Sequence, residues 1–175
     1  AFGITTVDAG QVISPELKFE GNKLYLIKHT PLDNYMPNVE QLKANWAYVH
    51  EQIQEENIVS GYALGFGGIA EAICKMSFGN GLDAKINVDE KELFNYGYGS
   101  ILVEAESELN YPNAVLIGEV TDGEDSELTI NGVKFDLFDL MAANSAKFAQ
   151  VYPDTAEAYC KDVVPAGLEN VKPFK

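Results

Sequence analysis

The fold is decided by residues 61–86, which have the sequence GYALGFGGIAEAICKMSFGNGLDAKI. Apolar residues at 58–64 predict a strand, and the glycines that follow predict a turn. Beyond the turn, one side of a predicted helix carries the apolar residues Ile69, Ala72, Ile73 and Met76. We expect this helix to end at the glycines of residues 79–81. The alternating apolar residues at 82–88 then predict a half-buried strand.

Further strands are predicted at residues 2–7, 24–28, 100–105, 114–120 and 128–130, and further helices at 39–57 and 136–151. Strands and helices do not alternate strictly, which favours the α+β class. We therefore expect a mixed, mainly antiparallel sheet with helices packed on it. The expected organisation is one α+β domain at residues 1–135, followed by a C-terminal helix and tail at 136–175 that leads toward a further domain.

Charge and composition exclude several classes of partner. The chain has 12 basic and 27 acidic residues, for a net charge of -15. Proteins that bind nucleic acid use clustered Lys and Arg, and the sequence has no such cluster. No apolar run approaches the roughly 20 residues that cross a bilayer. The sequence thus predicts neither a nucleic-acid nor a membrane partner, and its 2 cysteines favour the cytoplasm.

The glycine-rich turn is the candidate binding site. Gly65, Gly67 and Gly68 stand between a strand and a helix, where free N–H groups and the helix dipole favour a phosphate. The turn lacks the Lys and Ser/Thr of a P-loop and the third spaced glycine of a dinucleotide-binding motif. A tight turn, where helix and sheet pack closely, explains the same glycines.

Two nearby segments are weaker candidates. Residues 94–100, with the sequence FNYGYGS, have the glycines and tyrosines of a binding loop, or of a mobile loop anchored by aromatic rings. Glu104 and Glu106 lie on one face of a predicted strand, where a solvated face is the simplest interpretation.

No residue is predicted to act as a catalytic group or metal ligand. Asp8 is a lone carboxylate, and one carboxylate makes no metal site. Cys74 lies in a helical apolar pattern, which indicates a small buried side chain. Cys160, His29 and His50 form neither a CxxC pair nor a Cys/His metal spacing.

The order and content of the segments resemble the C-terminal half-domain of the AIR synthase superfamily. The resemblance rests on residues 61–86, on ELFNYGYGSILVE at 92–104, and on AFGITTVDAGQVISPELKFEGNKLYLI at 1–27. It covers roughly residues 1–135, in order. The long helix with Trp46 and the C-terminal helix and tail are most similar to the second such half-domain of the phosphoribosylformylglycinamidine synthase family.

That resemblance implies a function for a longer polypeptide. Such an enzyme uses ATP, Mg²⁺ and glutamine-derived ammonia to convert formylglycinamide ribonucleotide to its amidine in purine biosynthesis. It is a C–N ligase. The implied partners are an ATP-type half-domain and a glutaminase domain of the same polypeptide. The 175-residue chain alone is expected to be inactive and to hold no cofactor tightly. The alternatives are another ATP-dependent enzyme of the superfamily, or a non-catalytic binding or assembly module.

The chain departs from the family at the turn. Family members often carry His-Asp-x-Ser-Asp-Gly-Gly, where this chain has residues 62–68, YALGFGG. After Leu-Phe-Asn the family commonly has an acidic residue, where this chain has Tyr96. We therefore predict that Tyr62, Phe66, Tyr96 and Tyr98 form a degenerate ligand site that contacts another domain. The alternative is that these rings complete the domain's own core.

Overall fold

The computed structural model describes residues 3–152, with the exception of 124, 148 and 150. The chain divides into two units, Ala1–Met141 and Ala142–Lys175. In the second unit the described residues are the end of helix α4 and a few residues after it. The predicted tail at 153–175, including Cys160, lies outside the described residues. The expected domain boundary after residue 135 stays a prediction.

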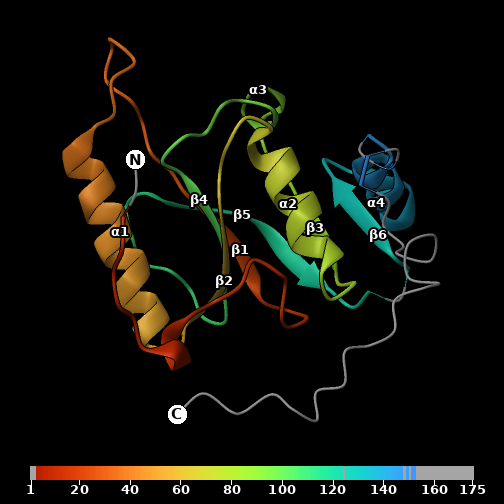
Figure 1. Cartoon of the computed structure of the whole chain (residues 1–175), viewed down its shortest axis with the longest axis horizontal. Coiled ribbons are helices and arrows are strands. Elements are labelled where there is room, and N and C mark those ends of the chain that lie inside the picture. Colours follow the sequence, from red (N-terminus) through yellow and green to blue (C-terminus); the bar gives the residue numbers. More distant parts are fainter. Residues whose placement is uncertain (1–2, 124, 148, 150, 153–175) are drawn as a thin grey trace, which may run out of the picture. The chain divides into compact units, whose positions relative to one another are not determined.

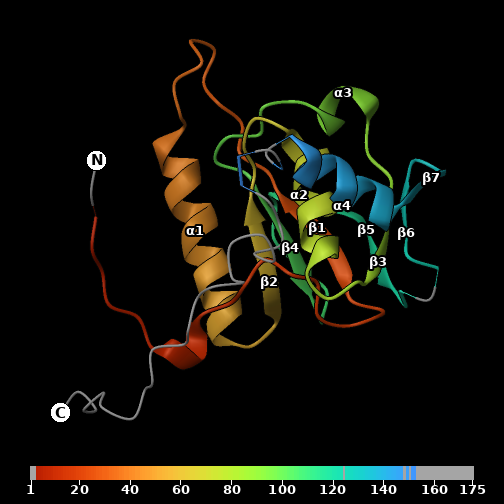
Figure 2. The same ribbon diagram turned by 45° about the vertical axis from the view of Figure 1, so that its right-hand side comes forward.

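The described strands form one mixed, mainly antiparallel sheet of seven strands, in the order β2-β4-β1-β5-β3-β6-β7 (Figure 1; β7 is labelled in Figure 2). Five of the neighbouring pairs are antiparallel, and β3 runs parallel to β6. The strands are β1 Lys23–Ile27, β2 Ile58–Ala63, β3 Asp83–Ile86, β4 Ile101–Ala105, β5 Ala114–Thr121, β6 Glu127–Ile130 and β7 Val133–Asp136. The predicted α+β class is confirmed.

Helices cover both faces of this sheet, α1 on one and α2 on the other (Figures 1 and 2). The helices are α1 Val39–Gln54, α2 Gly68–Phe78, the short α3 Glu90–Leu93 and α4 Leu137–Ala146, with a 3-10 turn η1 at Ala9–Gln11. Leu24 and Leu26 of β1 pack in the same cluster as α2, and Tyr25 and Ile27 pack with Val49 of α1. Because successive strand residues point to opposite faces, β1 is buried on both sides.

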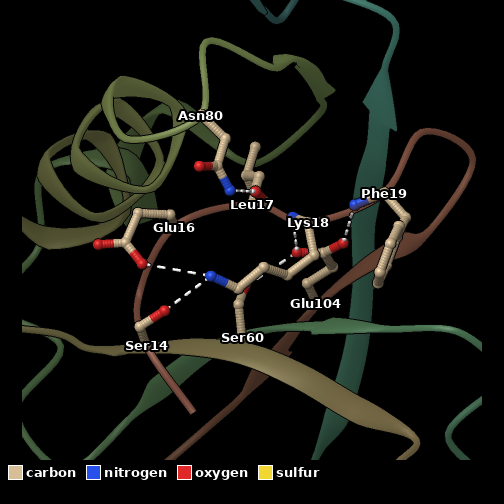
Figure 3. Close-up of polar contacts among 8 residues, drawn as sticks. All are labelled: Ser14, Glu16, Leu17, Lys18, Phe19, Ser60, Asn80 and Glu104. Atoms are coloured by element: carbon tan, nitrogen blue, oxygen red, sulfur yellow. Dashed lines mark hydrogen bonds and ion pairs between the residues drawn. The ribbon is translucent and has the colours of Figure 1, made fainter.

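Glu104 of β4 is completely buried, and it holds the segment before β1 onto the sheet (Figure 3). Its carboxylate accepts hydrogen bonds from Lys18 N (2.8 Å) and Phe19 N (3.0 Å). Asn22 Nδ2 and Ser60 Oγ donate two more, at 2.8 and 3.0 Å. Four donors replace the water that this charge loses on burial, which is the condition for a buried carboxylate.

The predicted solvated face is therefore wrong for Glu104, although Glu106, which follows the end of β4, is exposed. Side-chain contacts hold the preceding segment as well. Lys18 Nζ donates to Ser14 Oγ at 2.7 Å, and Asn80 Nδ2 donates to Leu17 O at 2.8 Å (Figure 3). The segment is thus held by one local contact, between Lys18 and Ser14, and by groups distant in sequence.

Several predicted elements are wrong. The strand predicted at residues 2–7 is absent from residues 3–8, where Ile4 and Val7 are exposed and pair with no strand. Instead, Ser14 forms an isolated β-bridge with Ser60 of β2. The predicted helix at 136–151 ends at Ala146, and α3 and β7 were not predicted. Apolar composition gives strand propensity, but a strand also needs a partner to accept its hydrogen bonds.

Candidate functional site

The glycine-rich turn connects β2 to α2 and lies against the segment after α3. Gly68 has φ +62°, and a Cβ built there would be 2.6 Å from Asn95 O and 2.9 Å from Leu93 O. A side chain has neither the conformation nor the room at this position. Gly65, in contrast, has nothing within 4 Å of the same hypothetical atom. The close backbone approach expected for this turn is therefore found at Gly68.

One N–H group of the turn is bound by the chain's own carboxylate. Gly67 N donates to Glu71 Oε2 at 3.0 Å, and Lys75 Nζ donates to Glu71 Oε1 at 2.6 Å. The hydrogen bond from Lys75, followed by that from Gly67, lowers the pKa of Glu71. The ammonium of Lys75 also lies 5.9 Å from the centre of the Tyr62 ring. A phosphate at this turn would compete with Glu71, and binding by Gly65, Gly67 and Gly68 stays a prediction.

A pocket of about 690 Å³ lies beside the turn, lined mostly by apolar atoms. It is formed by residues near the C-terminal ends of β1 and β2, the first turn of α2, the loop after β1 and the segment 92–100. Its lining residues are Leu26, Lys28, His29, Thr30, Pro31, Tyr35, Pro37, Leu64, Ile69, Glu92, Asn95, Tyr96, Gly97, Tyr98 and Ser100. The pocket has the size of a small-molecule site.

His29 joins the walls of this pocket, and no motif in the sequence revealed that role. Its backbone N–H donates to Ser100 Oγ at 2.9 Å. Asn38 N donates to His29 Nε2 at 3.1 Å, so the Nδ1 proton is the one that faces Tyr98 O, at 2.8 Å. Both ring nitrogens are thus occupied, and the imidazole holds the 98–100 segment to the start of α1.

Aromatic side chains gather on the surface near the pocket. The rings of Phe66 and Tyr96 stack at 4.9 Å with an interplanar angle of 22°, and Tyr98 lies 6.3 Å from Tyr96. Their exposed fractions are 72%, 58% and 60% respectively. We call these three residues the aromatic patch. Proximity and exposure together exclude the alternative that they complete the core, whereas Tyr62 is partly buried and packs against the core.

The remaining candidates do not join the pocket. Asp8 accepts a hydrogen bond from Gly10 N at 2.9 Å and caps η1. Cys74 is partly buried, and burial raises the pKa of its thiol. His50 is exposed on α1. Among the residues that the structure describes, no three His, Cys, Asp or Glu side chains converge as a preformed metal centre.

Within the same described part of the chain, none of the helices combines the length and apolar character needed to cross a membrane.

The chain resembles solved structures, although neither a family model nor a curated protein matches its sequence. PurLQS from Thermotoga maritima aligns over 75% of this chain and 28% of its own, with a TM-score of 0.63 and 12% identity. Phosphoribosylformylglycinamidine synthase II from the same organism aligns over 97% of this chain and 31% of its own, with a TM-score of 0.61 and 13% identity. HypE from E. coli, a hydrogenase maturation protein, aligns over 71% and 52%, with a TM-score of 0.52 and 14% identity.

These likenesses concern the fold, because similarity of folded shape at such identities carries no statement about chemistry. The chain spans less than a third of the two Thermotoga maritima chains. Its sheet and helices are arranged as in part of those chains, and this is the architecture expected from the resemblance described above. The chain therefore has the mixed α+β fold found in PurL and HypE, two members of the AIR synthase superfamily.

Proposed function

We propose that this chain is one domain of a cytoplasmic, ATP-dependent ligase that acts as phosphoribosylformylglycinamidine synthase. The observation that carries the proposal is the alignment with phosphoribosylformylglycinamidine synthase II over 97% of this chain, at a TM-score of 0.61. The order of the sequence segments at 1–27, 61–86 and 92–104 supports it independently. Solved structures include PurL from Thermotoga maritima complexed with ATP and with AMPPCP, which fits an ATP-dependent reaction.

In this proposal the domain supports the site, while other domains perform the chemistry. Where the family often carries His, Asp, Ser and Asp before the double glycine, this chain has Tyr62, Ala63, Gly65 and Phe66. These side chains offer no carboxylate to a metal ion and no general base. The carboxylate of Glu71 already accepts a hydrogen bond from the turn at Gly67 N. The pocket between the turn and His29 would then form one wall of a site completed by another domain.

The other half of the proposed polypeptide supplies the reactive groups. An ATP-type half-domain would bind ATP and Mg²⁺, and the metal would neutralise charge on the transferring phosphoryl group. The amide oxygen of formylglycinamide ribonucleotide would accept the phosphoryl group of ATP with release of ADP, and ammonia from a glutaminase domain would then attack the activated carbon and displace phosphate. The ATP-type and glutaminase domains are thus the proposed partners.

A phosphate-release assay tests this proposal. The complete open reading frame that encodes the chain is expressed, and phosphate is measured with ATP, Mg²⁺, glutamine and formylglycinamide ribonucleotide. We expect release that depends on the ribonucleotide in the full protein, and none from the 175-residue chain above a heat-treated control. Phosphate release by the chain alone would overturn the proposal. Phosphate release by the full protein that does not depend on the ribonucleotide would overturn it as well.

The aromatic patch favours a second candidate function, that of a non-catalytic assembly module. Phe66 and Tyr96 stack on each other while remaining exposed. Exposed rings of this kind are typical of contact surfaces, because a ring buries a large area and a hydroxyl finds a partner. Binding of the chain to the separately expressed ATP-type half-domain would be measured for the wild type and for a Phe66→Ser/Tyr96→Ser variant. Unchanged binding would exclude the patch as the contact.

A further inference from the structure

Four carboxylates gather at one end of β3, on the part of the sheet away from β2 and α1. Asp83 is the first residue of β3 and lies opposite Thr121, the last residue of β5. Asp122 follows directly, Asp125 precedes β6, and Glu127 is the first residue of β6, which pairs with the other side of β3. The β5–β6 connection therefore passes the start of β3. We call Asp83, Asp122, Asp125 and Glu127 the acidic cluster.

Asp83 is in an unfavourable environment for a carboxylate. Asp83 is only 4% exposed, and its Oδ1 atom is buried without a hydrogen-bond partner. Burial raises the pKa of Asp83, a hydrogen bond from the backbone of Glu127 partly offsets this rise, and the negative charges of Asp122, Asp125 and Glu127 raise the pKa further. A buried oxygen without a partner costs about 1–3 kcal/mol, and more if it is charged. Protonation of Asp83 or a bound cation would relieve this cost.

Few positively charged side chains contact the acidic cluster. Lys134 forms an ion pair with Glu127, and both side chains are partly exposed to solvent. Among the described residues, no ion pair reaches Asp83, Asp122 or Asp125. Lys134 also attracts Asp125 without forming an ion pair with it, and the net charge of the protein is already -15.

We propose that the acidic cluster binds a divalent hard cation, with Ca²⁺ as the preferred ion. Asp83 would supply the buried, fixed ligand, and the exposed Asp122 and Asp125 would turn toward it. The side chains do not converge as a preformed centre in this structure. A backbone oxygen, Gly81 O, also lies at this connection, 2.4 Å from a Cβ atom built on Gly123.

Ca²⁺ fits this arrangement better than Mg²⁺. It accepts six to eight oxygen ligands in flexible geometry, including carboxylates, backbone carbonyls and waters, whereas Mg²⁺ demands near-ideal octahedral geometry. Because the ligands must first come together, we expect a Kd of about 10⁻⁴–10⁻³ M, which is typical of weak calcium modules. This inference uses none of the residues of the pocket and does not depend on the proposed ligase function.

Thermal unfolding with increasing CaCl₂ tests the site, since a ligand that binds the folded state raises Tm with concentration. Two variants remove ligands: Asp83→Asn, and the double variant Asp122→Asn/Asp125→Asn. Glu51→Gln is the matched control, because Glu51 lies exposed on α1, which packs on β2 at the far edge of the sheet. Titration with Tb³⁺, followed by its luminescence, gives binding directly.

We expect Ca²⁺ to raise the Tm of the wild type and of Glu51→Gln equally, and to raise it much less in the other two variants. The apparent affinity should fall about tenfold or more, because affinity follows the number of charged ligands. An equal Ca²⁺ response in all four proteins, reproduced by NaCl of the same ionic strength, would show general screening of the net charge and overturn the proposal. No Ca²⁺ response in the wild type would leave protonation of Asp83 as the explanation, and would overturn it too.

Discussion

Replacing Gly68 by alanine is expected to destabilise the protein by about 2–4 kcal/mol. A left-handed conformation costs an ordinary residue about 1–2 kcal/mol, and Gly68 has φ +62°. The new Cβ would also be 2.6 Å from Asn95 O and 2.9 Å from Leu93 O, which are backbone atoms that cannot rotate away. Moving the segment after α3 to make room adds about 1–2 kcal/mol, within the range for overpacking. Gly68→Val adds two further methyl groups and should cost more.

Thermal and urea unfolding of Gly68→Ala, Gly68→Val and Gly65→Ala measure this cost. For a chain of this length, the loss corresponds to a fall in Tm of about 4–16 °C. Gly65 is the matched control, since it lies three residues away with open space around it. Gly65→Ala should change stability by less than about 0.5 kcal/mol. Equal midpoints for Gly68→Ala, Gly68→Val and the wild type would refute the reasoning from close approach.

Three further perturbations have defined outcomes. Glu104→Gln should lower the free energy of unfolding, measured in urea, by about 2–4 kcal/mol. The amide NH₂ of glutamine would face N–H and O–H groups that now donate hydrogen bonds to the carboxylate. A loss below about 0.5 kcal/mol would contradict the role of Glu104. The second perturbation is a change of pH, with EDTA present to remove metal ions. Because folding raises the pKa of Asp83, this residue stabilises the fold fully below its ordinary pKa of 3.8, and the stabilisation is lost as the pH rises through the raised pKa. Asp83→Asn should therefore gain stability relative to the wild type between acid and neutral pH, and a constant difference would count against this sign. Phe66→Ser and Tyr96→Ser should shift Tm by only a few degrees, since both rings are exposed; a large fall in Tm would contradict the exposed positions of these rings.

The sequence predicted the central strand–turn–helix–strand unit because its signals are local. The apolar period of α2, the glycines on either side of it and the alternation in β3 all lie within residues 58–88. The same is true of α1, where the side chain of Asn38 caps the helix by accepting a hydrogen bond from Gln41 N. Local rules failed at residues 3–8, which have the composition of a strand but no partner.

Burial of polar groups was decided by residues that are distant in sequence. Glu104 has the alternation of a solvated face, yet its donors come from residues 82–86 positions earlier and from Ser60. Asp83 shows no pattern of its own, and its unusual environment arises only because β5 and β6 pair on either side of β3. Neither feature could be read from neighbouring residues.

The sequence by itself determined the fold class, the glycine-rich turn and the departure from the family pattern at residues 62–68 and at Tyr96. Those follow from propensity, periodicity and resemblance, which need no knowledge of long-range contacts. Only the tertiary structure decided that Phe66 and Tyr96 stack, that His29 joins two walls of a pocket, and that Gly68 has no room for a side chain. Each of these depends on the segment 93–98 lying against residues about 25 to 70 positions earlier in the chain. Strand pairing brings those segments together, and its register is fixed by the burial of the whole sheet rather than by any one segment.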